Sequence, residues 1–169
     1  MVHQFVVDPG KNFTVTIVKI TPRADPVANP PRNDLPQPYK TSRDWGTLPA
    51  GMKWAAVTAV EPAPDGTVYV IHRCFENSCA GRSEAPILKF DRQGRLVASS
   101  GQGMFLFPHG ATVDRDGNLW VGTFGGLGRL SNGEWRTEIS PDGLAFDAVS
   151  SIIQDREGNI WVGAKDGLV

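Results

Sequence analysis

One short element occurs three times in this chain, and it constrains the fold more than any other feature. The stretch PDGTVYV (64–70) returns as RDGNLWV (115–121) and again as REGNIWV (156–162). Each copy places an acidic residue and a glycine before an apolar run with an aromatic centre, which predicts a turn followed by a strand. The copies recur after about 50 and then about 40 residues, the length of a β-propeller blade. The sequence therefore predicts consecutive propeller blades.

Further apolar runs around each copy predict the other strands of each blade. Four predicted strands surround the first copy and are joined as an antiparallel meander, the unit of a blade. They cover residues 55–63, 67–73, 86–91 and 95–101. The second blade has predicted strands at 109–114, 118–123, 127–131 and 134–140, with the hairpin signal Asn132-Gly133 between the last two. A third blade has two, at 148–155 and 160–164, and the sequence stops where the next strand would begin.

Residues 1–54 have a different composition. The run FTVTIVKI (13–20) predicts a strand, and residues 21–41 hold six prolines, which remove backbone donors and predict an extended arm. Trp45 and Trp54 follow, and we expect them to fix the arm to the domain by aromatic packing. The predicted fold is therefore all-β: an incomplete β-propeller of about two and a half four-stranded blades with an extended Pro-rich N-terminal arm. The blades cover about residues 55–107, 108–147 and 148–169.

Two and a half blades cannot close a ring of four to eight. The unpaired edges of an open propeller favour association with other strands. Three alternatives remain open: the chain is a fragment, copies self-associate to close the propeller, or the N-terminal strand and arm cover the edge.

Charge and hydropathy narrow the range of partners. The formal net charge is −1 and the basic residues are scattered, so the sequence does not predict nucleic-acid binding. No apolar run approaches the roughly 20 residues that span a bilayer, and the N-terminus lacks the pattern of a signal peptide. The expected partner is therefore a peptide or small-molecule ligand.

The two cysteines, Cys74 and Cys79, lie close together in CFENSC. A loop of this length closes a small disulfide in an oxidising compartment, whereas in a reducing one the two remain thiols. The sequence leaves both alternatives open. The usual zinc signature needs a second pair of ligands, so these two residues alone do not predict a zinc site.

Residues 39–123 resemble the peptidyl-α-hydroxyglycine α-amidating lyase family, six-bladed propellers related to NHL repeats. The resemblance rests on VTAVEPAPDGTVYVIHR (57–73), on RCFENSCAG (73–81) and above all on ILKFDRQGRLVASSGQGMFLFPHGATVDRDGNLWV (87–121). It implies a secreted or periplasmic zinc enzyme that also binds calcium. The implied reaction is carbon–nitrogen cleavage of a peptidyl-α-hydroxyglycine, which gives a peptide amide and glyoxylate.

The resemblance also implies site residues. The histidine of Pro-His-Gly, His109, would bind zinc, and Arg73 at the end of a strand would bind substrate and act as a catalytic residue. The main-chain carbonyls of Val60 and Ala111 would hold a structural calcium. In such a site the zinc polarises the hydroxyl group and a base takes its proton.

The chain departs from this pattern in its ligand set. Catalytic zinc usually takes three protein ligands, and of the histidines His3, His72 and His109 only the last matches a family ligand. The lyase family also has a catalytic tyrosine, and neither Tyr39 nor Tyr69 of this chain matches it. The alternative is that His109 is a structural histidine and Arg73 an ion-pair partner. We also expect the side chains of His72 and Arg73, as neighbours on a strand, to point to opposite faces.

Residues 118–169 resemble a second family, the two-component-regulator propeller repeat of sensory ectodomains. The matching stretches are NLWVGTFGGLGRLSNGEW (118–135) and VSSIIQDREGNIWVGAKDGL (149–168). The leading hypothesis is a lyase-like propeller with an incomplete site in this chain. The alternative is a non-enzymatic ligand-binding or sensory propeller segment of a two-component regulator.

Overall fold

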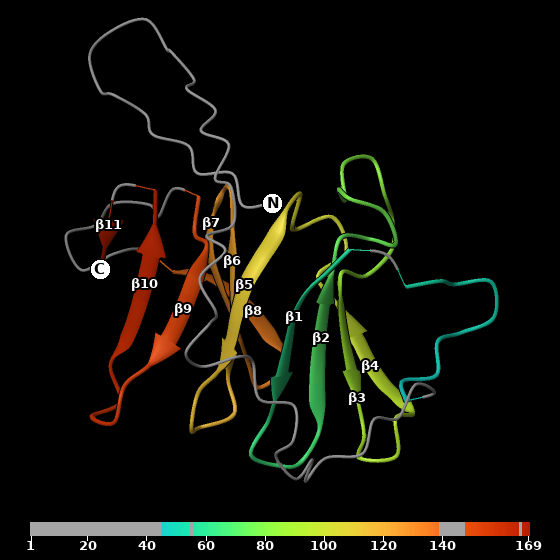
Figure 1. Cartoon of the computed structure of the whole chain (residues 1–169), viewed down its shortest axis with the longest axis horizontal. Helices are drawn as coiled ribbons and strands as arrows, with labels where there is room; N and C mark the ends of the chain where they lie inside the picture. Colours follow the sequence, from blue (N-terminus) through green and yellow to red (C-terminus); the bar gives the residue numbers. More distant parts are fainter. Residues whose placement is uncertain (1–44, 55, 139–147, 166) are drawn as a thin grey trace, which may run out of the picture. The chain divides into compact units, whose positions relative to one another are not determined.

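The computed structural model describes residues 45–54, 56–138, 148–165 and 167–169. The strand predicted at 13–20 and the Pro-rich run at 21–41 lie outside these ranges. The chain has two units, residues 1–41 and 42–169, and the described residues belong to the second. Its described residues form eleven β-strands and no helix, which confirms the predicted all-β class (Figure 1).

The strands form three antiparallel sheets in which neighbours along the chain are also neighbours in the sheet. The first sheet contains β1 (Val57–Pro62), β2 (Val68–His72), β3 (Ile87–Phe90) and β4 (Leu96–Ser100). The second contains β5 (Pro108–Val113), β6 (Leu119–Thr123), β7 (Gly126–Ser131) and β8 (Glu134–Glu138). The third contains β9 (Ser151–Gln154), β10 (Ile160–Ala164) and β11 (Gly167–Leu168). Each sheet is a propeller blade or part of one.

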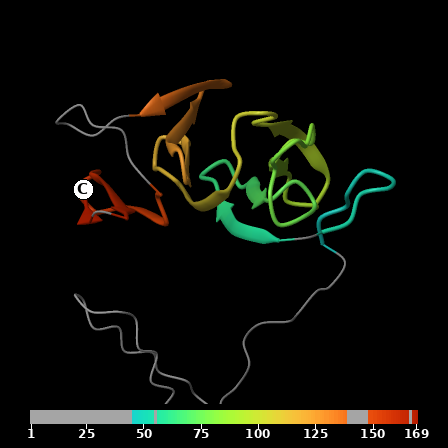
Figure 2. The same ribbon diagram turned by 90° about the horizontal axis from the view of Figure 1, so that it is seen from above.

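The three sheets follow one another in chain order, and β5 lies between β1 and β9 (Figures 1 and 2). The first and second sheets share a core that contains Tyr69, Ile71, Leu119 and Val121. The second and third share another, formed by Leu127, Val149, Ile152 and Val162. Alternate residues of a strand point to opposite faces, so β6 supplies Leu119 and Val121 to one core and Trp120 to the other.

The turns of the second and third copies are each held by an aspartate that precedes the acidic-Gly pair. Asp114 accepts hydrogen bonds from the backbone of Asn118 at 2.8 Å and from the indole of Trp120 at 2.9 Å. Asp155 accepts the equivalent bonds from Asn159 and from Trp161, both at 2.8 Å. The bonds from Asn159 and Trp161 lower the pKa of the Asp155 carboxyl to about 2.

The acidic residues of the three acidic-Gly pairs, at which the sequence predicts turns, are Asp65, Asp116 and Glu157. Asp65 holds its own turn, because its carboxylate accepts the backbone N–H of Thr67 at 2.9 Å. In the other two turns the recorded side-chain bonds go to Asp114 and Asp155 instead. The signal was present in the sequence as an aspartate six residues before each repeat tryptophan. The predicted Asn132-Gly133 hairpin is confirmed, since both residues have positive φ, 52° and 83°, between β7 and β8.

Residues 45–54 cover the face of the first sheet that points away from the second. The rings of Trp45 and Trp54 lie 5.6 Å and 5.9 Å from that of Phe90, which is fully buried. The backbone N–H of Thr47 donates to the carbonyl of Gly94 at 2.9 Å. The predicted packing of these two tryptophans onto the domain is therefore present.

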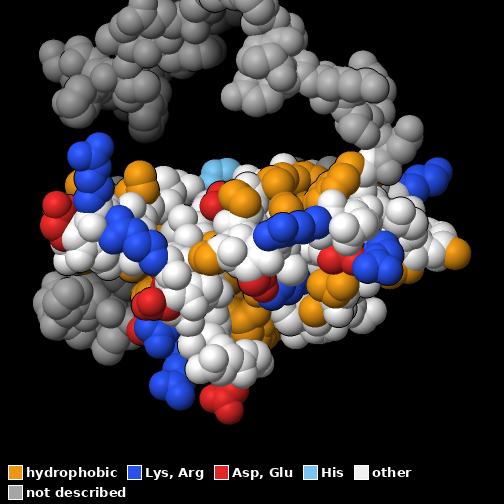
Figure 3. All heavy atoms as spheres, turned by 90° about the horizontal axis from the view of Figure 1, so that it is seen from below, with side chains coloured by type: hydrophobic (Ala, Val, Ile, Leu, Met, Phe, Trp, Pro, Cys, Tyr) orange, Lys and Arg blue, Asp and Glu red, His pale blue; other side chains and the backbone are white. Residues whose placement is uncertain are grey.

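Basic and acidic side chains are mixed over the face shown in Figure 3, and no large patch of a single sign appears there. This agrees with the near-zero net charge of the whole sequence. The described residues contain no helix that is long and apolar enough to cross a membrane.

Candidate functional site

The first element of the candidate site is Arg73, the residue that follows β2. Its backbone N–H donates to the carbonyl of Ala56 at 3.0 Å, which fixes where the side chain leaves the sheet. The preceding residue, His72, is fully buried and its ring packs against Trp54 and Phe75. His72 and Arg73 thus have different surroundings, as expected for neighbours on a strand.

The guanidinium of Arg73 meets the imidazole of His109, which lies in β5 of the second sheet. Nη2 of Arg73 is 3.1 Å from Nδ1 of His109. Nη1 donates to Oδ1 of Asn77 at 2.8 Å, and the guanidinium carbon lies 5.2 Å from the centre of the Phe107 ring. The structure therefore brings together the two residues that the lyase resemblance singled out, from two different sheets.

This contact determines where His109 can hold its proton. A guanidinium has donors and no acceptor, so Nδ1 of His109 must accept. The neutral imidazole then carries its proton on Nε2. With this hydrogen bond in place, Arg73 and His109 both present N–H donors, an arrangement suited to an anionic oxygen.

A pocket of about 250 Å³ lies beside the pair. Arg73 contributes from the first sheet, His109 and Phe124 from the second, and residues 148–150 from the segment leading into β9. The rings of Phe107 and Phe124 lie edge to face at 5.5 Å, so two aromatic rings flank the donors. The site joins paired N–H donors to apolar and aromatic lining, as small-ligand pockets commonly do.

Two glycines let the third sheet approach closely enough to form this wall. A Cβ at Gly110 would lie 2.4 Å from the carbonyl oxygen of Ser150, and one at Gly122 would lie 2.3 Å from the Val149 side chain. The backbone N–H of Val149 also donates to the carbonyl of Thr123 at 2.9 Å. The glycine of Pro-His-Gly thus has a packing role of its own.

A larger pocket, of about 420 Å³, lies elsewhere along the first and second sheets. Its charged lining residue is Lys89, whose Nζ is already 3.1 Å from the Asp65 carboxylate and lies over the Tyr69 ring. An ammonium group paired in this way offers less to an incoming anion than Arg73 does. We therefore place the candidate site at the smaller pocket.

The described residues do not make up a zinc site. Among them, no group of three or more His, Cys, Asp or Glu side chains lies close enough together to hold a metal ion. Nδ1 of His109 is engaged by Arg73. Zinc binding by His109 stays a prediction, and no chemical step is derived through a metal.

The residues predicted to hold calcium lie in neighbouring first strands. Val60 is in β1 and pairs with Val70, and Ala111 is in β5 and pairs with Val121. β1 and β5 are in contact, so the two backbones come from adjacent blades. Calcium binding at these carbonyls stays a prediction.

Comparison with known sequences finds a partial match to each of the two kinds of protein that the chain resembles. Residues 108–125 and 143–166 match the two-component regulator propeller family. A stretch of 39 residues is 49% identical to peptidyl-glycine alpha-amidating monooxygenase B of Xenopus laevis, and the A form of that protein matches at 46%. This stretch covers 22% of the chain and 4% of either relative.

Comparison with solved structures supports the fold. The extracellular domain of a protein described as a hybrid two-component system of B. thetaiotaomicron superposes with a TM-score of 0.50 at 16% identity. The match covers 66% of this chain and 15% of that one. A gluconolactonase of Xanthomonas campestris gives a TM-score of 0.48 at 22% identity, over 69% of this chain and 38% of the other. The chain thus has a propeller fold, and the two stretches named above are similar to the two-component regulator propeller repeat.

Sequence reasoning did not find several residues of the site. None of Phe107, Phe124, Asn77 and Ser150 was singled out from the sequence. Phe107 is next to the Pro-His-Gly element, a position that could have drawn attention to it. The contribution of residues 148–150 depends on the packing of the third sheet onto the second, for which no local signal exists.

Proposed function

We propose that this propeller binds a carboxylate-bearing peptide or small molecule in the pocket beside Arg73 and His109. The observation that carries the proposal is the 3.1 Å contact between Arg73 Nη2 and His109 Nδ1, which leaves further donors of both side chains for a ligand anion. Nε of Arg73 is buried and has no recorded partner. Phe107 and Phe124 would contact the apolar part of the ligand next to its carboxylate.

The regulator repeats and the disulfide bear on the setting of this binding. The third blade belongs to a repeat that matches the two-component regulator propeller family. Cys74 and Cys79 form a disulfide, which persists in oxidising compartments such as the periplasm or the extracellular space. We therefore propose a sensory propeller segment that meets its ligand outside the cytoplasm.

A second candidate is the reaction that the lyase resemblance implies. It is favoured by one specific observation, the meeting of Arg73 and His109 from separate blades in a single pocket. A peptidyl-α-hydroxyglycine is itself a carboxylate-bearing peptide, so both candidates share the first step of ligand capture. The binding function ranks first because it needs only the N–H donors that Arg73 and His109 present.

Calorimetric titration with three short peptides tests the binding proposal. The peptides share one sequence and end in glycine, in α-hydroxyglycine, or in glycine amide, which lacks the carboxylate. We expect the two acids to bind at least about tenfold more tightly than the amide, because a charge-assisted hydrogen bond contributes about 1.5–3 kcal/mol. Arg73→Gln should remove that preference.

Arg136→Gln on β8 is the matched control, because it removes an exposed arginine whose recorded partner is Glu134. Equal affinity for acid and amide, or an unchanged preference in Arg73→Gln, would contradict the proposal. Glyoxylate release from the α-hydroxyglycine peptide decides the second candidate. Binding of the acids with no glyoxylate formed eliminates the lyase and leaves the binding function in place.

A further inference from the structure

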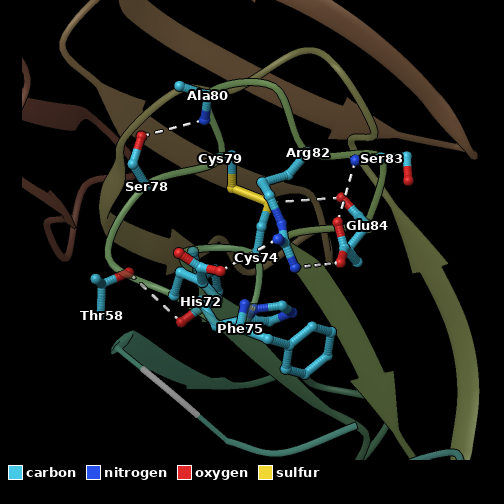
Figure 4. The surroundings of a disulfide bond; sticks show 12 residues. Thr58, His72, Cys74, Phe75, Ser78, Cys79, Ala80, Arg82, Ser83 and Glu84 are labelled. Carbon is cyan, nitrogen blue, oxygen red and sulfur yellow. Dashed lines mark hydrogen bonds and ion pairs between the residues drawn. A yellow bond between two sulfur atoms is a disulfide. The ribbon is translucent and has the colours of Figure 1, made fainter. Parts of the chain in front are cut away.

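Arg73 stands at the start of a loop that a disulfide closes. Cys74 follows it directly and is bonded to Cys79, and both half-cystines are buried, with 1% and 6% of their surface exposed. Figure 4 shows the bond crossing the loop, with the Arg82 side chain beside it. Arg82 forms ion pairs with Glu76 at 3.1 Å and with Glu84 at 2.6 Å, which tie the two sides of the loop together.

The backbone of this loop is strained where it leaves Arg73. Cys74 and Phe75 have φ of 50° and 58°, in the left-handed region that non-glycine residues rarely adopt. Such a conformation persists only when its surroundings hold it in place. The backbone N–H of Phe75 donates to Nδ1 of buried His72 at 3.1 Å, and the disulfide holds the chain at Cys74.

The far end of the disulfide is attached to the segment that carries His109. The backbone N–H of Cys79 donates to the carbonyl of Leu106 at 2.9 Å. Leu106 is followed by Phe107, Pro108 and His109. One short path therefore runs from Arg73 through the disulfide and one hydrogen bond to the residues around His109.

Asn77 lies inside the ring closed by the disulfide and contacts the guanidinium itself. Its Oδ1 accepts from Nη1 of Arg73 at 2.8 Å, while Nη2 faces His109. Two fixed acceptors on two nitrogens set the plane of the guanidinium, because all its donors lie in one plane.

We propose that the Cys74–Cys79 disulfide and Asn77 position Arg73 against His109, so that the site binds its ligand with the disulfide closed and loses affinity when it is reduced. This inference rests on the proposed function for its ligand, but not for the geometry it predicts. Reduction by a dithiol transfers two electrons and two protons to the bond. It gives thiols at Cys74 and Cys79 and converts the reagent to its own disulfide. The chain has two cysteines in all, so a reductant acts on no other bond.

NMR relaxation of the Arg73 Nε–Hε group, in the whole chain, tests this positioning directly. The signal is assigned by its loss in Arg73→Lys. With the disulfide closed we expect an order parameter of about 0.8, and after treatment with dithiothreitol a value below about 0.6. Mass spectrometry after alkylation verifies the reduction. An order parameter that does not change on reduction overturns the proposal.

If reduction unfolds the protein, substitutions in the loop test the same positioning of Arg73 with the disulfide intact. Asn77→Ala should lower the Arg73 order parameter with the disulfide intact, and Asn77→Asp, which keeps an acceptor, should restore it. Ser78→Ala is the matched control, because Ser78 bonds the backbone of Ala80 in the same loop and not Arg73. An Asn77→Ala value equal to that of the control contradicts the role of Asn77.

The same samples separate this inference from the proposed function. Titration with the glycine-ended peptide should show at least a tenfold loss of affinity on reduction and in Asn77→Ala, and little change in Ser78→Ala. If no peptide binds in any state, the proposed function fails, and the order parameters still decide the positioning. If the peptide binds equally well before and after complete reduction, the redox dependence is wrong and the binding function stands.

Discussion

The first and third sheets each have a face that points away from the second, and the two faces differ in their cover. On the first sheet that face carries Val70, Leu88 and Phe90, all buried, beneath a cover formed by residues 45–54. On the third sheet, Ile153 and Trp161 are 64% and 42% exposed among the described residues. A segment outside the repeat thus buries one blade face, while within the described part of the chain the corresponding apolar face of the third sheet is exposed.

Trp120 and Trp161 occupy the same position in two copies of the repeat, and they differ in burial in the same way as the two faces. Trp120 and Trp161 each donate an indole N–H to the aspartate of their own turn, at 2.9 Å and 2.8 Å. Trp120 packs against the core shared with the third sheet and under the Arg129 guanidinium, whereas Trp161 has no such cover among the described residues. The hydrogen bond follows from local sequence, and the burial follows from the neighbouring sheet.

Replacing the residue at the centre of the covered face should have the largest effect. Phe90→Ala removes a fully buried ring that packs against Trp45 and Trp54, so we expect the free energy of unfolding to fall by about 4 kcal/mol. Ile153→Ala on the exposed face should cost less than about 1 kcal/mol. Urea unfolding followed by circular dichroism measures both. Equal losses would mean that the exposed face is covered in solution.

Replacing Trp120 or Trp161 should give the next largest difference in the free energy of unfolding. Trp120→Ala should lower the free energy of unfolding by about 3 kcal/mol, because it opens a cavity between the second and third sheets. Trp161→Ala loses the same indole hydrogen bond but less packing, and should cost about 1 kcal/mol. The same urea titrations apply. A loss at Trp161 that matches the loss at Trp120 would show that a further element packs on the third sheet, by self-association or otherwise.

The smallest effect is a pH dependence that differs between the two sheets. Burial lowers the pKa of His72, below the covered face, and the backbone of Ala85 and the Glu84 carboxylate oppose this to a lesser extent. The unfolded chain therefore takes up a proton first as the pH falls, so stability is full above about pH 6.5 and declines as the pH falls through the folded pKa.

On the third sheet the titrating group is Asp155, whose pKa is lowered to about 2, so its contribution is lost only below about pH 4. Unfolding measured from pH 8 to pH 2 should show these two separate windows. His72→Gln should remove the upper window and leave the lower one. An unchanged upper window in that variant would contradict the role given to His72.

Much of the fold could be predicted because its signals are local. Acidic-Gly turns before aromatic strands predicted the blades, and Asn132-Gly133 predicted a hairpin that the structure contains. Only two strands were predicted in the last blade, whereas the structure adds a short third strand, β11, at Gly167–Leu168. The turns and the hairpin depend on residues a few positions apart, so one sequence is enough to find them.

The site could be predicted only in part, because its contacts join distant segments. The resemblance singled out Arg73 and His109, but not their direct contact, nor Asn77 and Phe124 beside them. The disulfide was left open, since spacing alone does not decide whether Cys74 and Cys79 are bonded. In the second and third copies the residue that holds the turn, Asp114 or Asp155, lies two positions before the acid of the acidic-Gly pair, which is the more visible pattern.

The central claim is that Arg73 and His109 act as one binding unit across two blades. A double-mutant cycle tests it, with Arg73→Gln, His109→Gln and the double variant titrated with the glycine-ended peptide. The account predicts that the unmodified chain binds the peptide and that the two substitutions are coupled by about 1 kcal/mol or more, as for residues in direct contact. Effects that add to within about 0.5 kcal/mol, or a chain that does not distinguish the acid from its amide, would contradict it.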